Sequence, residues 1–208
     1  GAGNYASRML IPAFKATNTK LHTLISGQGL TSSIVGRKSG FNYASTDYKS
    51  ALANPEINTV VIATRHDLHA EQTIQALKSE KHVFVEKPLA INSEQLVSIK
   101  NCYQELSETN KQAPKLMLGF NRRFSPHVKK ITELLTPLHA PKNMVMTVNA
   151  GFIPKDHWTQ DAEVGGGRLL GEACHFVDLL RFLAGSKITD ASCANLSAEY
   201  SHMAEDEN

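Results

Sequence analysis

Two adjacent charges, Glu86 and Lys87, end an apolar, β-rich run that begins at His82, and Pro88 follows them directly. Proline fixes its own φ angle and restricts the residue before it, so we expect the Lys87 side chain to be held stiffly. A restrained ammonium group can donate a hydrogen bond to a substrate hydroxyl, and desolvation would ease its proton exchange. The alternative interpretation is an exposed lysine at a strand end, which is common in proteins.

The opening residues, GAGNYA, fit the pattern G-x-G-x-x-G/A at Gly1, Gly3 and Ala6. In a dinucleotide-binding fold such a loop lets the backbone approach a pyrophosphate, which lies at the N-terminus of the next helix. Short glycine patterns also occur by chance, and a plain glycine turn is the alternative. The sequence therefore predicts a cofactor loop, provided that strands and helices alternate after it.

The residue expected to meet the cofactor ribose is Ser26, at the end of a predicted strand, where an acidic residue is usual. A hydroxyl removes the charge repulsion that would exclude a 2′-phosphate, so both NAD and NADP remain possible. Arg37 and Lys38 could meet such a phosphate, or could form a solvated helix end.

The elements that must position these residues alternate along the first part of the chain. Apolar runs predict strands over 20–26, 58–64, 82–86 and 115–120, and periodic segments predict helices over 67–79 and 93–108. Strands separated by helices favour βαβ units, and hence an α/β Rossmann fold with a doubly wound parallel sheet. In such a sheet ligands bind beyond the carboxyl ends of the strands, where Glu86 and Lys87 lie.

The alternation of predicted strands and helices ends near residue 121. This change predicts a boundary between a dinucleotide-binding domain (1–120) and a partial α+β domain (121–208). The second part predicts a helix over 125–135, a strand over 143–151, a polar loop over 152–167, a helix over 168–185 and further strand over 188–200. We interpret the chain as a piece of a longer protein, because the strand that should precede the glycine loop is missing.

Composition argues against several classes of protein. The chain has 208 residues, 41% of them hydrophobic, and a formal charge of +2. No basic stripe for nucleic acid and no apolar run long enough for a bilayer is present, so we expect neither partner. Cys102, Cys174 and Cys193 are widely spaced, which favours free thiols and a cytoplasmic location.

Other residues allow two interpretations each. His66 and His69 lie close together without a third ligand nearby, so we expect no metal site. His157 and Trp158 lie in the polar loop, where the indole could cover a sugar, although burial in a core is the commoner fate of tryptophan. His175 begins an apolar helical stripe, and by itself it is typical of a packed histidine.

Five segments, in this order, carry a resemblance to the Gfo/Idh/MocA family of glucose-fructose oxidoreductases and inositol dehydrogenases: GAGNYA, IATRHDLHAEQTIQAL, KHVFVEKPLA, LGFNRRFSP and GGGRLLGEACHFVDLL. The resemblance covers nearly the whole chain, and the Glu-Lys-Pro element is its most specific part. It implies a Rossmann domain followed by a substrate domain with a large, mostly antiparallel sheet. It also implies NAD(P)-dependent oxidoreduction of sugars, inositols or nucleotide sugars.

Carried over by position, the resemblance assigns Lys87 and His175 to catalysis, the histidine as acid and base. It assigns the cofactor side to Glu86 and Pro88, together with Thr64, His66 and His69. We add as substrate candidates Arg123, His157, Trp158, Glu172 and Asp178.

The chain departs from the family pattern D-x-G-x-H, because Gly171 and Ala173 replace its first two fixed residues. Glu172 is displaced by one position, and Asp178 shares the helix face of His175 at i+3, so either carboxylate could serve the histidine. From the resemblance as a whole we expect the intact protein to be an oxidoreductase that forms a homo-oligomer. The alternative, which this departure keeps open, is a cofactor-binding sensor that does not turn over substrate.

Overall fold

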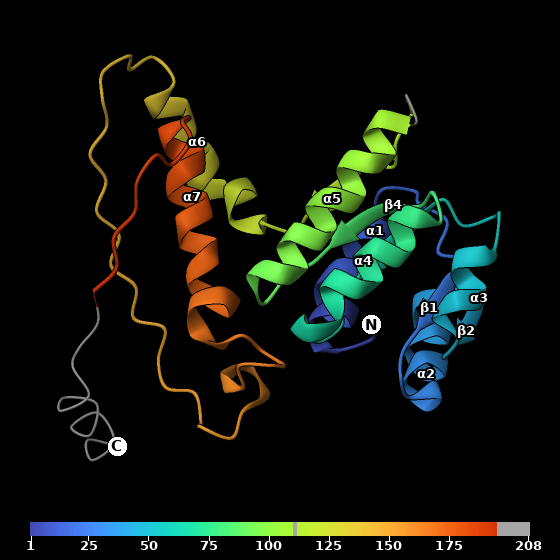
Figure 1. The fold of residues 1–208 in the computed structure, drawn as a ribbon. Helices are drawn as coiled ribbons and strands as arrows, with labels where there is room; N and C mark the ends of the chain where they lie inside the picture. The colour runs from blue at the N-terminus through green and yellow to red at the C-terminus, as the bar shows by residue number, and fades with distance from the viewer. Residues whose placement is uncertain (110–111, 195–208) are drawn as a thin grey trace.

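The protein folds around two parallel sheets (Figure 1), as seen in a computed structural model that describes residues 1–109 and 112–194. The first sheet pairs β1 (Thr23–Ile25) with β2 (Tyr43–Ser45). The second has the order β3 (Thr59–Ile62), β4 (His82–Val85) and β5 (Leu116–Leu118). The predicted parallel arrangement is confirmed, because every pair of neighbouring strands runs in the same direction.

Helices connect the strands in the predicted alternation. Before β4 they are η1 (Ala6–Leu10), α1 (Ile11–Lys15), α2 (Gly29–Ser39), α3 (Tyr48–Ala53), η2 (His66–Leu68) and α4 (His69–Lys78). After β4 they are α5 (Ser93–Thr109), η3 (Asn121–Phe124), α6 (Pro126–Leu135), η4 (Trp158–Gln160), η5 (Leu169–Ala173) and α7 (Cys174–Ala184). The sequence interpretation did not include β2 or α3, which are short and carry weak apolar patterns.

Strand β4 is covered on both faces, which explains its continuous apolar sequence. Val83 and Val85 are buried in one hydrophobic cluster with Leu77 of α4 and Cys102 of α5. Phe84 points to the other face, as alternation along a strand requires, and its ring meets the ring of Phe14 in α1 at 5.5 Å. Figure 1 shows α4 and α5 on one side of β4 and α1 behind it.

A second, smaller cluster stabilises the β1–β2 sheet. It consists of Ala2, Ile11 and Leu24, with partly buried side chains around them. Ala2 belongs to the glycine loop and Ile11 to α1, so this cluster fixes the loop against β1. Each sheet therefore has a core of its own.

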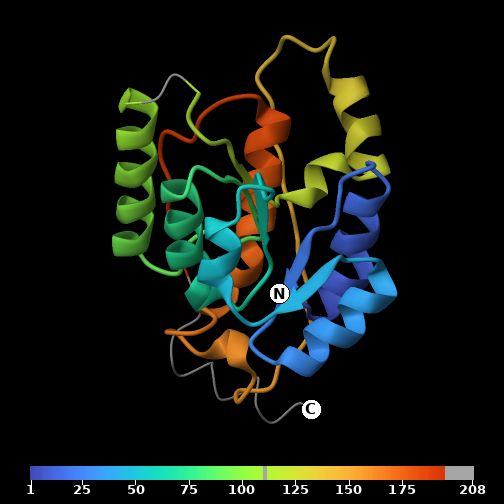
Figure 2. The same ribbon diagram turned by 90° about the vertical axis from the view of Figure 1, so that its right-hand side faces the viewer.

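The strand predicted over 143–151 is not formed, which corrects the sequence interpretation. These residues run as an extended trace that joins no sheet (Figures 1 and 2). Val145 is 90% exposed. An isolated extended segment has no neighbour for its backbone groups, and two or more strands are needed to satisfy them.

Further strand expected over 188–200 is likewise absent from 188–194, and the rest of that range lies outside the described residues. The mostly antiparallel sheet of a second domain is thus not seen in the described part, and the domain boundary near residue 121 stays a prediction. No helix among the described residues has the length and apolar character needed to cross a membrane.

Candidate functional site

The glycine loop leads directly into the first helical segment, where the Ser7 N–H donates to the Gly3 carbonyl at 2.9 Å. A Cβ atom on Gly1 would lie 2.0 Å from the Ala63 carbonyl oxygen, so only glycine fits against the end of β3. A Cβ atom on Gly3 would meet no described atom within 4 Å. The loop therefore packs on the sheet through Gly1 and presents an open backbone at Gly3, with Ala6 buried behind it.

Ser26 follows β1, and its hydroxyl donates to the Gln28 carbonyl at 2.6 Å. This bond shapes the turn into α2 and leaves the hydroxyl oxygen able to accept a further bond. Arg37 and Lys38 lie in the last turn of α2, whereas Ser26 precedes its first turn. Their position favours the interpretation of a solvated helix end over contact with a phosphate near Ser26.

His69 fixes the carboxyl ends of β3 and β4 to each other. It is 1% exposed, and its ring nitrogens lie 2.7 and 3.2 Å from the carbonyl oxygens of Pro88 and Thr64. Burial lowers the pKa of His69, an effect that these carbonyls partly oppose. His69 is therefore placed to position Pro88, and its predicted contact with a cofactor stays a prediction.

Glu86 and Lys87 point in different directions from the end of β4. Glu86 is buried, its Oε1 has no hydrogen-bond partner among the described residues, and burial raises the pKa of its carboxyl group. The Lys87 ammonium donates to the main-chain carbonyl of Gly171. Lys87 is thus held between the Rossmann sheet and the segment that carries His175, and the peptide bond to Pro88 is cis.

His66 joins the polar loop to the sheet, a role that sequence did not indicate. Its Nδ1 donates to the Gly165 carbonyl at 2.8 Å, and the neighbouring Asp67 N–H donates to the Val164 carbonyl at 3.1 Å. The His66 ring also meets the indole of Trp158 at 4.8 Å, and burial lowers its pKa. His66 therefore holds the loop in place over the end of β3.

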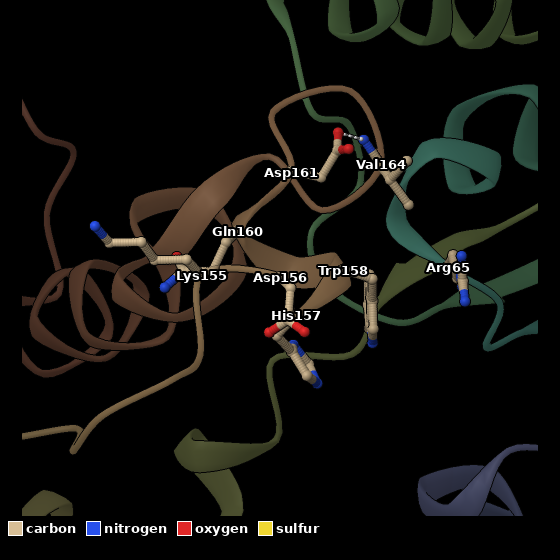
Figure 3. Close-up of a pocket in the computed structure, with 8 residues that line it drawn as sticks. All are labelled: Arg65, Lys155, Asp156, His157, Trp158, Gln160, Asp161 and Val164. Atoms are coloured by element: carbon tan, nitrogen blue, oxygen red, sulfur yellow. Dashed lines mark hydrogen bonds between the residues drawn. The ribbon is translucent and has the colours of Figure 1, made fainter.

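This loop forms one wall of a cavity of about 480 Å³, in which Trp158 lies between Arg65 and His157 (Figure 3). The Arg65 guanidinium lies 5.7 Å from the centre of the indole ring. The cavity also contains the carboxylates of Asp156 and Asp161. Two of the five predicted substrate residues, His157 and Trp158, thus share a cavity of mixed charge.

His175 begins α7, directly after the π-helical segment η5. The wider turn is closed by the Cys174 N–H, which donates to the Leu169 carbonyl five residues back, and such turns are frequent at functional sites. The His175 side chain is 9% exposed, and its Nδ1 has no hydrogen-bond partner within the described part of the chain. Burial and the charges of Lys87 and Arg122 lower the pKa of His175 to about 4.

Neither acidic residue expected to serve His175 is bonded to it. Glu172 pairs with Arg168 at 2.8 Å. Asp178 pairs with Arg123, which donates to it through both Nε and Nη2, the former at 2.7 Å. The predicted hydrogen bond of His175 to a carboxylate is therefore not formed, because each candidate carboxylate pairs with an arginine instead. Arg123, a predicted substrate residue, is one of these arginines and is held by Asp178.

A second cavity of about 430 Å³ lies beside His175 and is lined by Asn121, Arg122, Phe124, Ser125 and His175. The guanidinium of Arg122 lies 4.5 Å from the centre of the Phe176 ring. The sequence favours one arginine of this segment as a ligand contact, with Arg123 as the candidate, and the structure places its neighbour Arg122 in the lining of this cavity. The available signal was the placement of NRRF at the carboxyl end of β5, which does not distinguish the two arginines.

The chain matches the family model described as an oxidoreductase family with an NAD-binding Rossmann fold, GFO_IDH_MocA, over residues 1–112. Together with the parallel sheets and the open glycine loop, this match shows that the chain belongs to that family. The resemblance drawn from sequence is confirmed.

Three similar proteins illustrate the family. Myo-inositol 2-dehydrogenase of Thermotoga maritima is 28% identical over 153 residues, which are 74% of this chain and 44% of that enzyme. The 4-carboxy-2-hydroxymuconate-6-semialdehyde dehydrogenase of Sphingobium is 29% identical over 205 residues, 92% of this chain and 59% of that enzyme. The structure of levoglucosan dehydrogenase with NADH and levoglucosan has a TM-score of 0.70 at 23% identity, covering 89% of this chain and 53% of that one. The chain thus spans less than two thirds of these relatives.

Proposed function

We propose that the intact protein is an NAD(P)-dependent oxidoreductase that acts on a secondary hydroxyl of a sugar, inositol or nucleotide sugar. The observation that carries this proposal is the convergence of Lys87, at the end of β4, with η5, the segment that leads into α7 and His175. Lys87 bonds to Gly171 of that segment, and its charge contributes to the lowered pKa of His175. Two relatives named for a polyol and a sugar derivative support the substrate class.

The residues at the glycine loop suit a dinucleotide. The open backbone at Gly3 leaves room for a pyrophosphate, and the N–H groups of the first helical turn lack partners within the helix. Ser26 would meet the ribose, and Thr64 and Glu86 would lie on the nicotinamide side. When bound, the cofactor supplies the hydride chemistry, and the protein supplies orientation and electrostatics.

His175 and Lys87 would have different roles at the reacting hydroxyl group. A histidine with a pKa of about 4 is neutral near pH 7 and can accept the hydroxyl proton without first losing its own. The Lys87 ammonium would donate a hydrogen bond to the same oxygen and stabilise the negative charge that develops there. His157 and Trp158 would contact the remainder of the substrate. The domain boundary near residue 121 and a homo-oligomeric assembly belong to this proposal.

Turnover by the intact protein tests this function against the sensor alternative. We expect a rise in the absorbance of reduced nicotinamide when NAD⁺ or NADP⁺ is mixed with members of a panel of sugars, inositols and nucleotide sugars. A sensor would bind both cofactor and sugar in calorimetry with no absorbance change. Binding of both ligands without turnover would contradict the proposed enzymatic activity and would still support the cofactor site.

Replacing Gly3 with valine should weaken cofactor binding while the fold remains intact. No described atom lies within 4 Å of the position of its Cβ atom, so we expect the fold to accept the substitution and the ligand to be obstructed. We expect an increase in Kd of about 100-fold, equivalent to roughly 3 kcal/mol, measured by NADH titration. Gly1→Ala gives the contrasting case, because its Cβ would overlap Ala63 and should lower the Tm, which Gly3→Val should not. Unchanged NADH and NADPH binding by Gly3→Val would contradict the assignment of the loop.

A further inference from the structure

We propose that the substrate carries a carboxylate or phosphate group, and that Arg122 binds this group in the cavity beside His175. The inference rests on the proposed oxidoreductase function and narrows its substrate class. It concerns a residue and a chemistry that the family resemblance did not select.

Arg122 is the arginine of its segment that is available to a ligand. Its neighbour Arg123 is held by Asp178 through two donors and lies over the Phe182 ring. Arg122 makes no ion pair or side-chain hydrogen bond with any residue of the described ranges, and only the Phe176 ring steadies its guanidinium. A guanidinium presents a rigid fork of donors that matches carboxylate and phosphate oxygens.

The cavity around Arg122 favours an anion. Its lining contains no acidic residue, and Asn121 and Ser125 can supply further hydrogen bonds. Ser125 is also the N-cap of α6, so the positive end of this ten-residue helix lies at the rim. Two positive features, the Arg122 guanidinium and the N-terminus of α6, therefore border a space that also offers neutral hydrogen-bonding groups.

His175 provides an independent indication that a ligand binds here. It lines the cavity, only 9% of it is exposed, and its buried Nδ1 has no partner among the residues that the structure describes. Buried polar groups are normally bonded, and an exception is often found at a catalytic or ligand-binding position. A substrate that offers its reacting hydroxyl to His175 would place an acidic substituent a few bonds away within reach of Arg122.

The other cavity has a different character. Arg65 also lies over an aromatic ring, but Asp156 and Asp161 line the same space. The two carboxylates offset the positive charges of Arg65 and Lys155, so this cavity suits neutral hydroxyl groups. Arg65 therefore serves as the comparison that identifies which cavity takes an anion.

Calorimetry on the intact protein, with and without saturating NADH, tests the inference independently of turnover. The probes are D-glucuronate and D-glucose 6-phosphate, with D-glucose as the neutral parent. We expect at least one anionic probe to bind more than about tenfold tighter than glucose, a difference of roughly 1.4 kcal/mol. The two acids separate a carboxylate site from a phosphate site.

Three variants locate the effect. Arg122→Gln should abolish the preference for the anionic probe, Arg122→Lys should retain part of it because the charge remains, and Arg181→Gln, an exposed arginine on α7, should retain all of it. Loss of the preference in Arg65→Gln but not in Arg122→Gln would overturn the inference. Absence of any preference in the wild type would also overturn it, while NADH binding and turnover would still report on the proposed function separately.

Discussion

Lys87→Met should lower kcat by about 10²- to 10⁴-fold and leave the Kd for NADH nearly unchanged. Methionine keeps most of the length of the side chain but removes the ammonium group that would donate to the reacting oxygen. The effect should appear in kcat and kcat/KM together, because the lost bond strengthens as charge develops in the transition state. Steady-state kinetics on the substrate found in the panel, together with NADH titration, measures both quantities.

Lys115→Met is the matched control, because Lys115 is exposed at the opposite end of a strand in the same sheet. Its replacement should leave kcat within about twofold, as is usual for surface changes of a few tenths of a kcal/mol. Near-normal turnover by Lys87→Met would show that Lys87 only connects β4 to Gly171. An equal loss in both variants would point to a general effect on folding.

His175→Gln should reduce dehydrogenation by at least about 10³-fold, since glutamine preserves hydrogen bonding but cannot accept a proton near neutral pH. Cofactor binding should persist, because His175 lies on α7 and not on the Rossmann sheet. Retained turnover would assign proton acceptance to another group and return His175 to the class of packed histidines.

The pH dependence gives a sharper signature of the same residue. Burial, Lys87 and Arg122 lower the pKa of His175 to about 4, so the neutral, proton-accepting form prevails above that pH. The value of kcat/KM, which reports the free enzyme, should therefore not fall as pH drops through 6.5, the ordinary histidine value, and should decline only near pH 4. In Lys87→Met the residual rate should decline at a higher pH, because one of the charges that lower this pKa is gone.

Asp178→Asn separates chemistry from stability. Asp178 raises the pKa of His175 slightly against the dominant lowering effects, so its loss should move the acid limb downward and leave His175 functional. The larger effect should be on Tm, because Arg123 would lose its partner at a cost of up to about 3 kcal/mol. A collapse of kcat with an unchanged Tm would restore Asp178 as the partner of His175.

Much of the Rossmann half follows from local patterns. The position of Lys87 could be predicted because an apolar strand must end at the ligand-binding edge of a parallel sheet, and the apolar sequence of β4 marks that end. The glycine loop is equally local. The different roles of its two glycines could not be predicted locally, because the residue that requires glycine at position 1 is Ala63, which is distant in sequence.

The rest depends on contacts that no local pattern contains. Arg122 and Arg123 are identical neighbours in sequence, and only Asp178, on another helix, distinguishes them. Segment 143–151 has an apolar pattern that suits a strand, but a strand requires a neighbour, and the pattern does not supply one. His175 was assigned through resemblance, because its apolar surroundings in sequence predict a packed residue.

The two separate hydrophobic clusters predict that the two sheets of the Rossmann half open with different free energies, although Phe14 and Gly1 connect them. The cluster of Ala2, Ile11 and Leu24 is the smaller, so the sheet of β1 and β2 should have the lower free energy of local opening. A dinucleotide that touched Ser26 beside one sheet and Thr64 beside the other would link them, and its binding energy would add to the stability of the weaker unit. Occupancy of the cofactor site would then determine how rigid the ribose-binding side is.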